Sequence, residues 1–278
     1  MTPEASKVTV PGLLAMKRRG EKIAMLSTYD YPSAKIADRS GVDVILVGDT
    51  LGMVVLGYET TLPVTMDEML CHVKAVARAR PACLVVADMP FMSFQVSPVE
   101  AVTNAGRMIK EGGAEAVKIE GGRCIAATVE AMSAAKIPVM GHVGLTPQAV
   151  CKFGGYKVQG RSDAARAAII EDAVALERAG CFSVVLEGIP WRLAEEITTR
   201  LGIPTIGIGA GPHCDGQVLV GHDLLGLYEG NVPKFVRKYA DLGRTIEGAF
   251  TSYVRDIKDG SFPSLDESYD NGQDRKKD

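Results

Sequence analysis

Residues 42–49 read VDVILVGD, and residues 182–188 read FSVVLEG. Each stretch is short and apolar almost throughout, and each has a carboxylate at or beside its last position, Asp49 in the first and Glu187 in the second. A strand needs continuous apolarity when both of its faces are covered, as in a parallel sheet flanked by helices. Both stretches therefore predict buried parallel strands with a charged group where the strand ends.

Similar runs recur along almost the whole chain and alternate with segments of helical periodicity. Repeated strand–helix units joined by right-handed crossovers form either an open doubly wound sheet or a closed barrel. Eight units favour the barrel, and the open sheet is the alternative. We therefore predict an α/β fold, a (β/α)8 TIM barrel in a single domain. The predicted strands are Ala24–Tyr29, Val42–Gly48, Cys83–Asp88, Ala116–Glu120, Pro138–His142, Cys181–Glu187, Pro204–Ile208 and Gln217–Gly221.

Two of the intervening helices carry start and stop signals. Ser97 is a capping residue followed by Pro98, which suits the first position of a helix, and Gly112 can end that helix. Ser162 precedes a second apolar stripe with a 3.6-residue period, and Gly180 can end it. These signals support helices between the predicted strands.

The length of 278 residues is ordinary for one α/β barrel. We predict that residues 1–259 form the barrel with an N-terminal helical extension, and that the polar residues 260–278 form a disordered tail. Two connections are long, residues 50–66 and 143–161. Long loops in a compact domain are usually functional or disordered.

Composition limits the partners and the compartment. A net charge of -3 provides no basic field for nucleic acid or anionic lipid. The chain has no apolar run long enough to cross a membrane, and its first residues lack the apolar core of a signal peptide. The six cysteines are scattered without metal-ligand spacing, which predicts reduced thiols. We therefore expect a cytoplasmic protein with no nucleic-acid or membrane partner.

Charged residues lie where the predicted strands end. Asp49, Asp88 and Glu187 close three strands, and a fourth strand carries Lys118 and Glu120. Side chains two apart on a strand share a face, so this lysine and glutamate project together, toward the barrel axis if their apolar neighbours meet the helices. In a barrel the carboxyl ends of the strands form the active site.

These charges have two explanations. Taken one at a time, each fits a structural ion pair or a solvated strand end. Together, four carboxylates and one ammonium at one barrel mouth would repel one another and lose solvation unless a cation compensates. Oxygen ligands suit Mg²⁺, so we infer from position a metal site at Asp49, Asp88 and Glu120. A 2-oxo acid could chelate the same ion, which would stabilise an enolate.

The histidines and one glycine-rich turn are less informative. His142 ends the fifth predicted strand and could help to shape the site. His72 fits a helix-surface or packing residue, and His213 and His222 flank the eighth strand, where a structural role suffices. Residues 207–211, GIGAG, fit either a phosphate-cradling turn or a tight turn at the barrel mouth.

Several longer motifs resemble those of the ketopantoate hydroxymethyltransferase family, also called 3-methyl-2-oxobutanoate hydroxymethyltransferases. They run in order along the chain from about residue 8 to residue 256 and leave only the tail outside. The matching stretches are VGDTLGMVVLGYETTLPVTMDEM (47–69), VVADMPFMSF (85–94), AVKIEGG (116–122), PVMGHVGLTPQ (138–148), FGGYKVQGR (153–161), VLEGIP (185–190) and IGIGAGPHCDGQVLVGHDLLGL (206–227).

The resemblance implies an enzyme of pantothenate biosynthesis with a (β/α)8 barrel. Such an enzyme transfers a hydroxymethyl group from 5,10-methylenetetrahydrofolate to 3-methyl-2-oxobutanoate, which gives 2-dehydropantoate and tetrahydrofolate. It implies Mg²⁺, one ion per subunit, as cofactor and the folate as co-substrate. It also implies self-association as a homodecamer of two stacked pentamers.

Matched motif by motif, the resemblance assigns roles to individual residues. Asp49, Asp88 and Glu120 fall at the metal positions. The oxo acid would be held by Asp49, Thr50, Asp88 and Lys118, and Glu187 falls at the proton-acceptor position. Thr50 departs from the family pattern, in which serine is common; its hydroxyl is retained, but the added methyl puts the fit at that position in doubt.

Two other functions remain as alternatives. A lyase or mutase of the phosphoenolpyruvate-mutase and isocitrate-lyase type shares the barrel, the metal and the enolate chemistry, but the cysteine-bearing KKCGH loop of the lyases is missing from the sequence. A catalytically silent barrel would have lost a carboxylate at the mouth, and here all of them are present.

Overall fold

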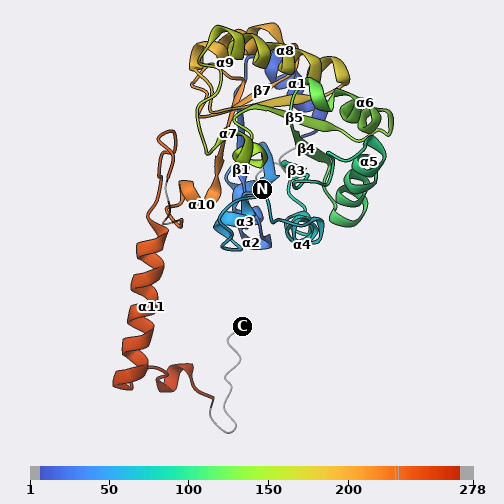
Figure 1. Ribbon diagram of the computed structural model, residues 1–278. Coiled ribbons are helices and arrows are strands. Elements are labelled where there is room, and N and C mark those ends of the chain that lie inside the picture. The colour runs from blue at the N-terminus through green and yellow to red at the C-terminus, as the bar shows by residue number, and fades with distance from the viewer. Residues whose placement is uncertain (1–6, 229, 231, 270–278) are drawn as a thin grey trace. The chain divides into compact units, whose positions relative to one another are not determined.

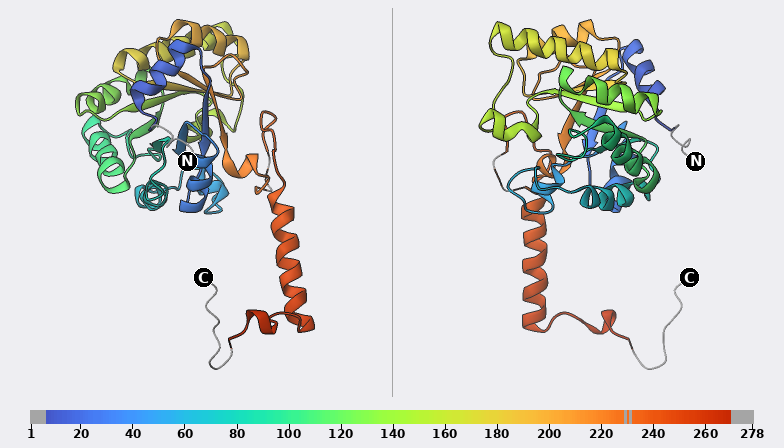
Figure 2. Two further views of the ribbon diagram at one scale, coloured as in Figure 1. Left: turned by 180° about the vertical axis from the view of Figure 1, so that it is seen from behind. Right: turned by 45° about the vertical axis from the view of Figure 1, so that its right-hand side comes forward.

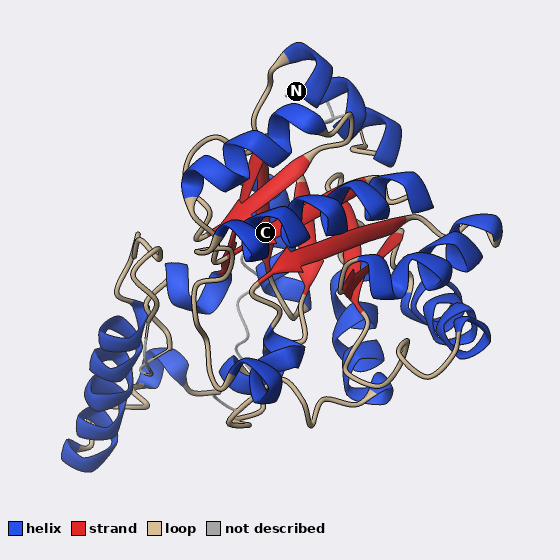
Figure 3. Cartoon of the chain, turned by 45° about the horizontal axis from the view of Figure 1, so that its top comes forward, coloured by secondary structure: helices blue, strands red, loops and turns tan. Residues whose placement is uncertain are grey.

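The computed structural model describes residues 7–228, 230 and 232–269. Eight parallel strands pair in chain order, and the last pairs with the first, so that the sheet closes into a barrel (Figures 1 and 3). The closed barrel confirms the predicted fold and excludes the open sheet. Its strands are β1 (Ile23–Ser27), β2 (Val44–Val47), β3 (Leu84–Asp88), β4 (Ala116–Glu120), β5 (Val139–Gly144), β6 (Ser183–Glu187), β7 (Thr205–Ile208) and β8 (Gly216–Val220).

All eight predicted strands are confirmed, with ends that shift by at most two residues. The prediction for β1 extended to Tyr29, whereas the strand ends at Ser27. The reason is local: Asp30 accepts a hydrogen bond from the Ser33 N–H at 2.8 Å and caps helix α2 (Tyr31–Arg39), so the preceding residues form the turn into the helix.

Helices cover the outside of the barrel (Figure 2). Both predicted helices with start and stop signals are present. The Ser97 side chain caps α5 (Pro98–Arg107), which continues into a π-helical turn, η1 (Met108–Gly112). The Ser162 side chain caps α8 (Asp163–Ala179), and Gly180 is the C-cap of that helix. The main surrounding helices are α2, α4 (Met66–Ala77), α5 (Pro98–Arg107), α6 (Ala126–Ala134), α8 (Asp163–Ala179) and α9 (Trp191–Arg200).

The apolar residues form two layers because neighbouring strand residues face opposite sides of the sheet. In β2, Val44 and Leu46 belong to the inner cluster, whereas Ile45 and Val47 pack in the outer cluster beneath the helices. Leu13 of α1 (Val10–Arg19) joins the inner cluster, so this N-terminal helix covers the end of the barrel where the strands begin. The opposite end, where the strands finish, is left for polar side chains.

The chain forms two compact units. Among the described residues, one comprises 7–221 with 233–236 and contains the barrel; the other comprises 222–228, 230, 232 and 237–269. The second unit contains α11 (Leu242–Asp259), which buries none of its residues and exposes several large apolar side chains. The 3-10 turn η4 (Leu265–Glu267) follows it.

The predicted polar tail, residues 260–278, is described only as far as residue 269; residues 270–278 lie outside the described part of the chain. The proposed extent of the barrel domain, residues 1–259, stays a prediction. All six cysteines are free, as expected of reduced thiols. Among the described residues no helix is both long enough and apolar enough to cross a membrane.

Candidate active site

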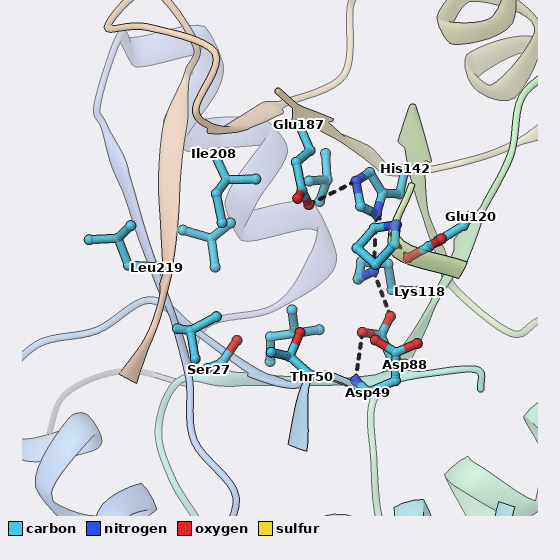
Figure 4. A pocket seen from close by; sticks show the side chains of 15 residues that line it. Ser27, Asp49, Thr50, Asp88, Lys118, Glu120, His142, Glu187, Ile208 and Leu219 are labelled. Carbon is cyan, nitrogen blue, oxygen red and sulfur yellow. Dashed lines mark hydrogen bonds and ion pairs between the residues drawn. The ribbon is translucent and has the colours of Figure 1, made fainter. Parts of the chain in front are cut away.

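A pocket opens where the strands end, with about 420 Å³ of empty space including solvent at its mouth. All five charged residues predicted for the site line it, as does Thr50. Figure 4 shows Asp49, Asp88, Lys118 and Glu120 on one side, Ile208 and Leu219 on the other, and Glu187 between them. The lining residues are Ser27, Leu46, Asp49, Thr50, Asp88, Lys118, Glu120, His142, Pro147, Val185, Glu187, Ile208, Val218, Leu219 and Val220.

Strand β4 supplies the centre of the polar side. Val117 and Ile119 pack in the outer cluster, so Lys118 and Glu120 point into the barrel as the alternation predicted. The Lys118 ammonium lies 2.7 Å from Asp88 Oδ1, and both side chains are buried. The second oxygen of that aspartate accepts a hydrogen bond from the Asp49 N–H at 3.1 Å, which ties the ends of β2 and β3 together.

His142 connects this pair to Glu187. Its Nδ1 lies 3.3 Å from Lys118 Nζ and 3.6 Å from Glu120 Oε1, and its Nε2 lies 3.3 Å from Glu187 Oε2. The result is a continuous run of contacts from Glu187 through His142 and Lys118 to Asp88 (Figure 4). A role for this histidine in shaping the site agrees with that position.

Burial and mutual repulsion govern the acids of the pocket. Burial raises the pKa of Asp49 well above its ordinary value, and the charges of Asp88 and Glu120 raise it further. Burial also raises the pKa of Asp88, although Lys118 opposes this. At Glu120 burial acts in the same direction, but hydrogen bonding and charge from His142 outweigh it, so the pKa is lowered.

Both basic groups have raised pKa values. Burial lowers the pKa of Lys118, but the charges of Asp88, Glu120 and Asp49 outweigh that effect and raise it. Burial and the nearby ammonium lower the pKa of His142, yet its contacts with Glu120 and Glu187 raise it to about 9. With every group ionised, four carboxylates face two cations, which leaves an excess of two negative charges.

This excess matches one divalent cation. Within the described residues, no three histidine, cysteine, aspartate or glutamate side chains are already arranged around a single point as metal ligands. Mg²⁺ does not require such a cage, because it typically binds through one or two carboxylates and keeps several waters. Asp88 Oδ1 makes no hydrogen bond of good geometry. The carboxylates of Asp49, Asp88 and Glu120 therefore fit a hard divalent ion in donor type, charge and location.

Two polar residues at the site were not predicted. Ser27 ends β1 and lines the pocket, and Gln148 is buried behind the carboxylates. The signal for Gln148 was its place in the GLTPQ stretch of a long connection, but nothing in the pattern indicated which way its side chain points. Ser27 precedes Thr28 in a polar turn with no charge to mark it.

The other candidates have structural explanations. His72 Nδ1 lies 2.7 Å from the Tyr29 carbonyl oxygen, and His213 lies on the surface 3.6 Å from Glu195. In the turn at residues 207–211, a Cβ on Gly209 or Gly211 would come within 2.6 Å and 2.3 Å of neighbouring side chains. Close packing therefore accounts for these glycines, which favours the tight turn over the phosphate cradle.

Comparison with solved structures supports the barrel fold. It supports nothing about function, because the sequence identities are low. Phosphonopyruvate hydrolase in complex with oxalate and Mg²⁺ matches with a TM-score of 0.61 at 15% identity, covering 93% of this chain and 92% of that one. 2,3-Dimethylmalate lyase, a member of the PEP mutase/isocitrate lyase superfamily, matches with a TM-score of 0.60 at 16% identity, covering 94% and 91%.

Sequence comparison is more specific. The 3-methyl-2-oxobutanoate hydroxymethyltransferase of Trichlorobacter lovleyi is 61% identical over 263 residues, which cover 95% of this chain and 98% of that protein. The enzyme of the same name from Moorella thermoacetica is 58% identical and covers 96% and 99%. The model of the ketopantoate hydroxymethyltransferase family matches residues 7–265. The chain therefore belongs to the ketopantoate hydroxymethyltransferase family.

Proposed function

We propose that this protein transfers a hydroxymethyl group from 5,10-methylenetetrahydrofolate to 3-methyl-2-oxobutanoate, which yields 2-dehydropantoate and tetrahydrofolate for pantothenate biosynthesis. One observation carries the proposal: in a chain of this family, three acids, a lysine and a fourth acid converge on one pocket at the end of the barrel. Formation of an enolate from a 2-oxo acid requires ligands for a cation, a positive charge for the carboxylate and a general base, and these residues can provide all three.

The polar side of the pocket would hold the oxo acid. Asp49, Asp88 and Glu120 would bind one Mg²⁺ per subunit, which when bound polarises the oxo group and offsets developing enolate charge. Lys118 is charged and buried, so it can attract the substrate carboxylate without a change in its own protonation. Thr50 lines the same pocket, and its hydroxyl can donate a hydrogen bond to that carboxylate.

Glu187 is proposed as the general base that removes the proton from C3 of the oxo acid. Its carboxylate ends β6, lines the pocket and is less buried than the metal-side acids, with 15% of its side chain exposed. His142 lies 3.3 Å away and can hold the carboxylate in one orientation. Proton abstraction needs a positioned carboxylate base within reach of the C3 proton.

The apolar side of the pocket suits the alkyl end of the substrate. Val185, Ile208, Val218 and Leu219 line the pocket. Figure 4 shows Ile208 and Leu219 across from Asp49, Asp88 and Glu120. A branched C3 centre would contact these side chains and keep water away from the reacting carbon.

The proposed transfer consumes one water molecule. C3 loses its proton to Glu187 and forms a carbon–carbon bond with the methylene carbon of the folate. Water supplies the hydroxyl oxygen of the hydroxymethyl group overall, and the bonds from the methylene carbon to the two folate nitrogens break, with protons returned to those nitrogens.

The lyase or mutase alternative shares only the fold with this chain, since its structural representatives are 15% and 16% identical, whereas the hydroxymethyltransferases above reach 58% and 61%. The silent-barrel alternative predicts a missing acid, and all the acids line the pocket. Both alternatives remain as outcomes of the test below.

We further propose a cytoplasmic homodecamer. Six free cysteines support a reducing compartment. Helix α11 has an exposed apolar face formed by Ile246, Phe250, Tyr253, Val254 and Ile257, and it supports self-association, because contiguous exposed apolar side chains often mark a contact with another protein surface.

The test is incubation of the purified protein with Mg²⁺, 3-methyl-2-oxobutanoate and 5,10-methylenetetrahydrofolate, with 2-dehydropantoate followed by mass spectrometry. We expect product that disappears when a chelator is added and returns with Mg²⁺. A folded, metal-loaded protein that makes no product would contradict the transferase assignment and favour one of the two alternatives.

A further inference from the structure

Gln148 is a buried polar residue beside the pocket to which the proposed reaction assigns no role. It lies in the 3-10 turn η3 (Pro147–Ala149) of the long connection after β5, and it is 6% exposed. Its side chain donates through Nε2 to Asp49 Oδ2 and to the Met89 carbonyl oxygen, both at 2.9 Å. Its main-chain N–H donates to Glu120 Oε2 at 3.0 Å. One residue thus contacts groups from the ends of β2, β3 and β4.

The orientation of the Gln148 amide is determined by its neighbours. The Met89 carbonyl oxygen can only accept, so Nε2 must face it, and the same nitrogen then faces Asp49. On the other side, Gln148 Oε1 accepts from Gln95 Nε2 at 3.0 Å, and Gln95 Oε1 accepts from the Phe94 N–H at 3.3 Å. A backbone acceptor at one end and a backbone donor at the other therefore fix both amides.

We propose that Gln148 is a positioning residue that orients the Asp49 carboxylate for a divalent cation, with Gln95 holding the Gln148 amide in place. The inference rests on the proposed function only in assigning the cation to these acids. Asp49 and Asp88 repel each other, and the hydrogen bond from Gln148 restrains one oxygen of Asp49 while leaving the other available.

A positioning role and a merely structural role for Gln148 predict different effects on cation affinity. A residue that only holds the loop would affect the free energy of unfolding and leave the cation affinity of the folded protein unchanged. A residue that orients a ligand changes that affinity, and loss of such outer partners typically weakens metal binding or activity about 10- to 100-fold.

The variant Gln148→Met keeps the length of the side chain and removes its hydrogen bonds, while the main-chain N–H to Glu120 remains. Gln159→Met is a matched control, because Gln159 lies in the same connection and its side chain donates only to the Lys157 carbonyl oxygen at 2.8 Å. A second variant, Gln95→Met, leaves Gln148 in place and removes the donor that fixes its amide.

The measurement is the dissociation constant for Mn²⁺, as a probe of the Mg²⁺ site, by electron paramagnetic resonance on folded protein. We expect Gln148→Met to weaken binding about 10- to 100-fold, Gln95→Met to weaken it less, and Gln159→Met to stay within about twofold of the native value. At saturating Mn²⁺, kcat of Gln148→Met should recover most of its loss.

A Mn²⁺ affinity of folded Gln148→Met within twofold of native would overturn the proposal, as would a native protein that binds no Mn²⁺. If Gln148→Met does not fold, Gln95→Met decides by the same criterion. Failure of the proposed function is a separate result, in which native protein binds Mn²⁺ but forms no 2-dehydropantoate. The Mn²⁺ dissociation constants of native protein and Gln148→Met could still be compared in that case.

Discussion

Asp49 and Glu120 point into the same pocket, yet their pKa values move in opposite directions. Burial dominates at Asp49, which has the charges of two other acids beside it, whereas contact with His142 and Lys118 keeps Glu120 ionised. Loss of the proton is therefore harder at Asp49 than at an exposed aspartate, and a bound divalent cation would make that loss easier.

This difference makes a prediction about pH. An acid whose pKa is raised by folding binds more protons in the folded state, so the stability of the metal-free protein falls as pH rises above the ordinary aspartate value. Mg²⁺ removes that destabilisation, and we expect it to raise the melting temperature more at pH 8 than near pH 4, close to the ordinary aspartate value. Mn²⁺ affinity should increase by up to about tenfold per pH unit for one displaced proton. Differential scanning fluorimetry and calorimetry in two buffers test this; an affinity independent of pH would contradict it.

Glu187 should control how fast the C3 proton of the oxo acid exchanges with solvent. Because it is the proposed base, Glu187→Gln should slow exchange of the C3 proton of 3-methyl-2-oxobutanoate into deuterated water about 10²- to 10⁴-fold without changing Mn²⁺ affinity. Proton NMR of the substrate measures the exchange. Glu195→Gln is the control, since Glu195 lies exposed on α9 beside His213. Native-like exchange in Glu187→Gln would exclude it as the base.

Helix α8 shows how single residues at element ends contribute to the barrel. Ser162 accepts a hydrogen bond from the Ala165 N–H at 3.3 Å at the first turn, and Gly180 adopts a left-handed conformation, with φ 108°, at the end. The helix between them buries Ile169, Ala173 and Leu176 against the strands. We expect Ser162→Ala to lower the free energy of unfolding by about 1 kcal/mol.

Urea denaturation followed by circular dichroism measures that change. Thr199→Ala is the control, because Thr199 lies exposed within α9 and caps no helix, and it should stay within about 0.5 kcal/mol of native. Equal destabilisation by both substitutions would show that the cap hydrogen bond contributes nothing measurable.

At the scale of the whole molecule, α11 presents an apolar face that its own unit does not cover. If that face carries the proposed self-association, Phe250→Glu should lower the mass in solution from about ten times 29.6 kDa toward that of smaller species. Light scattering after size-exclusion chromatography gives the mass. Lys258→Glu, a charge change near the end of the same helix, should leave it unchanged. An unaltered mass for Phe250→Glu would place the interface elsewhere.

Apolar periodicity and strand-end charges were enough to predict the barrel and most of the pocket. Apolar strands such as VILV and SVVLE, with helix caps between them, specify parallel βα units, since a strand covered on both faces has few other environments. Parallel strands in a closed barrel all end at one rim, so the acids at those ends, and Lys118 with Glu120 on one face of β4, were predicted to meet, and they do.

The contacts between those groups could not be predicted in the same way. His142 joins Glu187 to Lys118, and Gln148 reaches Asp49 across 99 positions of sequence. Strand periodicity indicates which face a side chain occupies, but η3 and the turns around it have no period from which a direction follows. Their side chains take the orientation that satisfies buried polar groups of other strands, and those partners become neighbours only when the barrel closes.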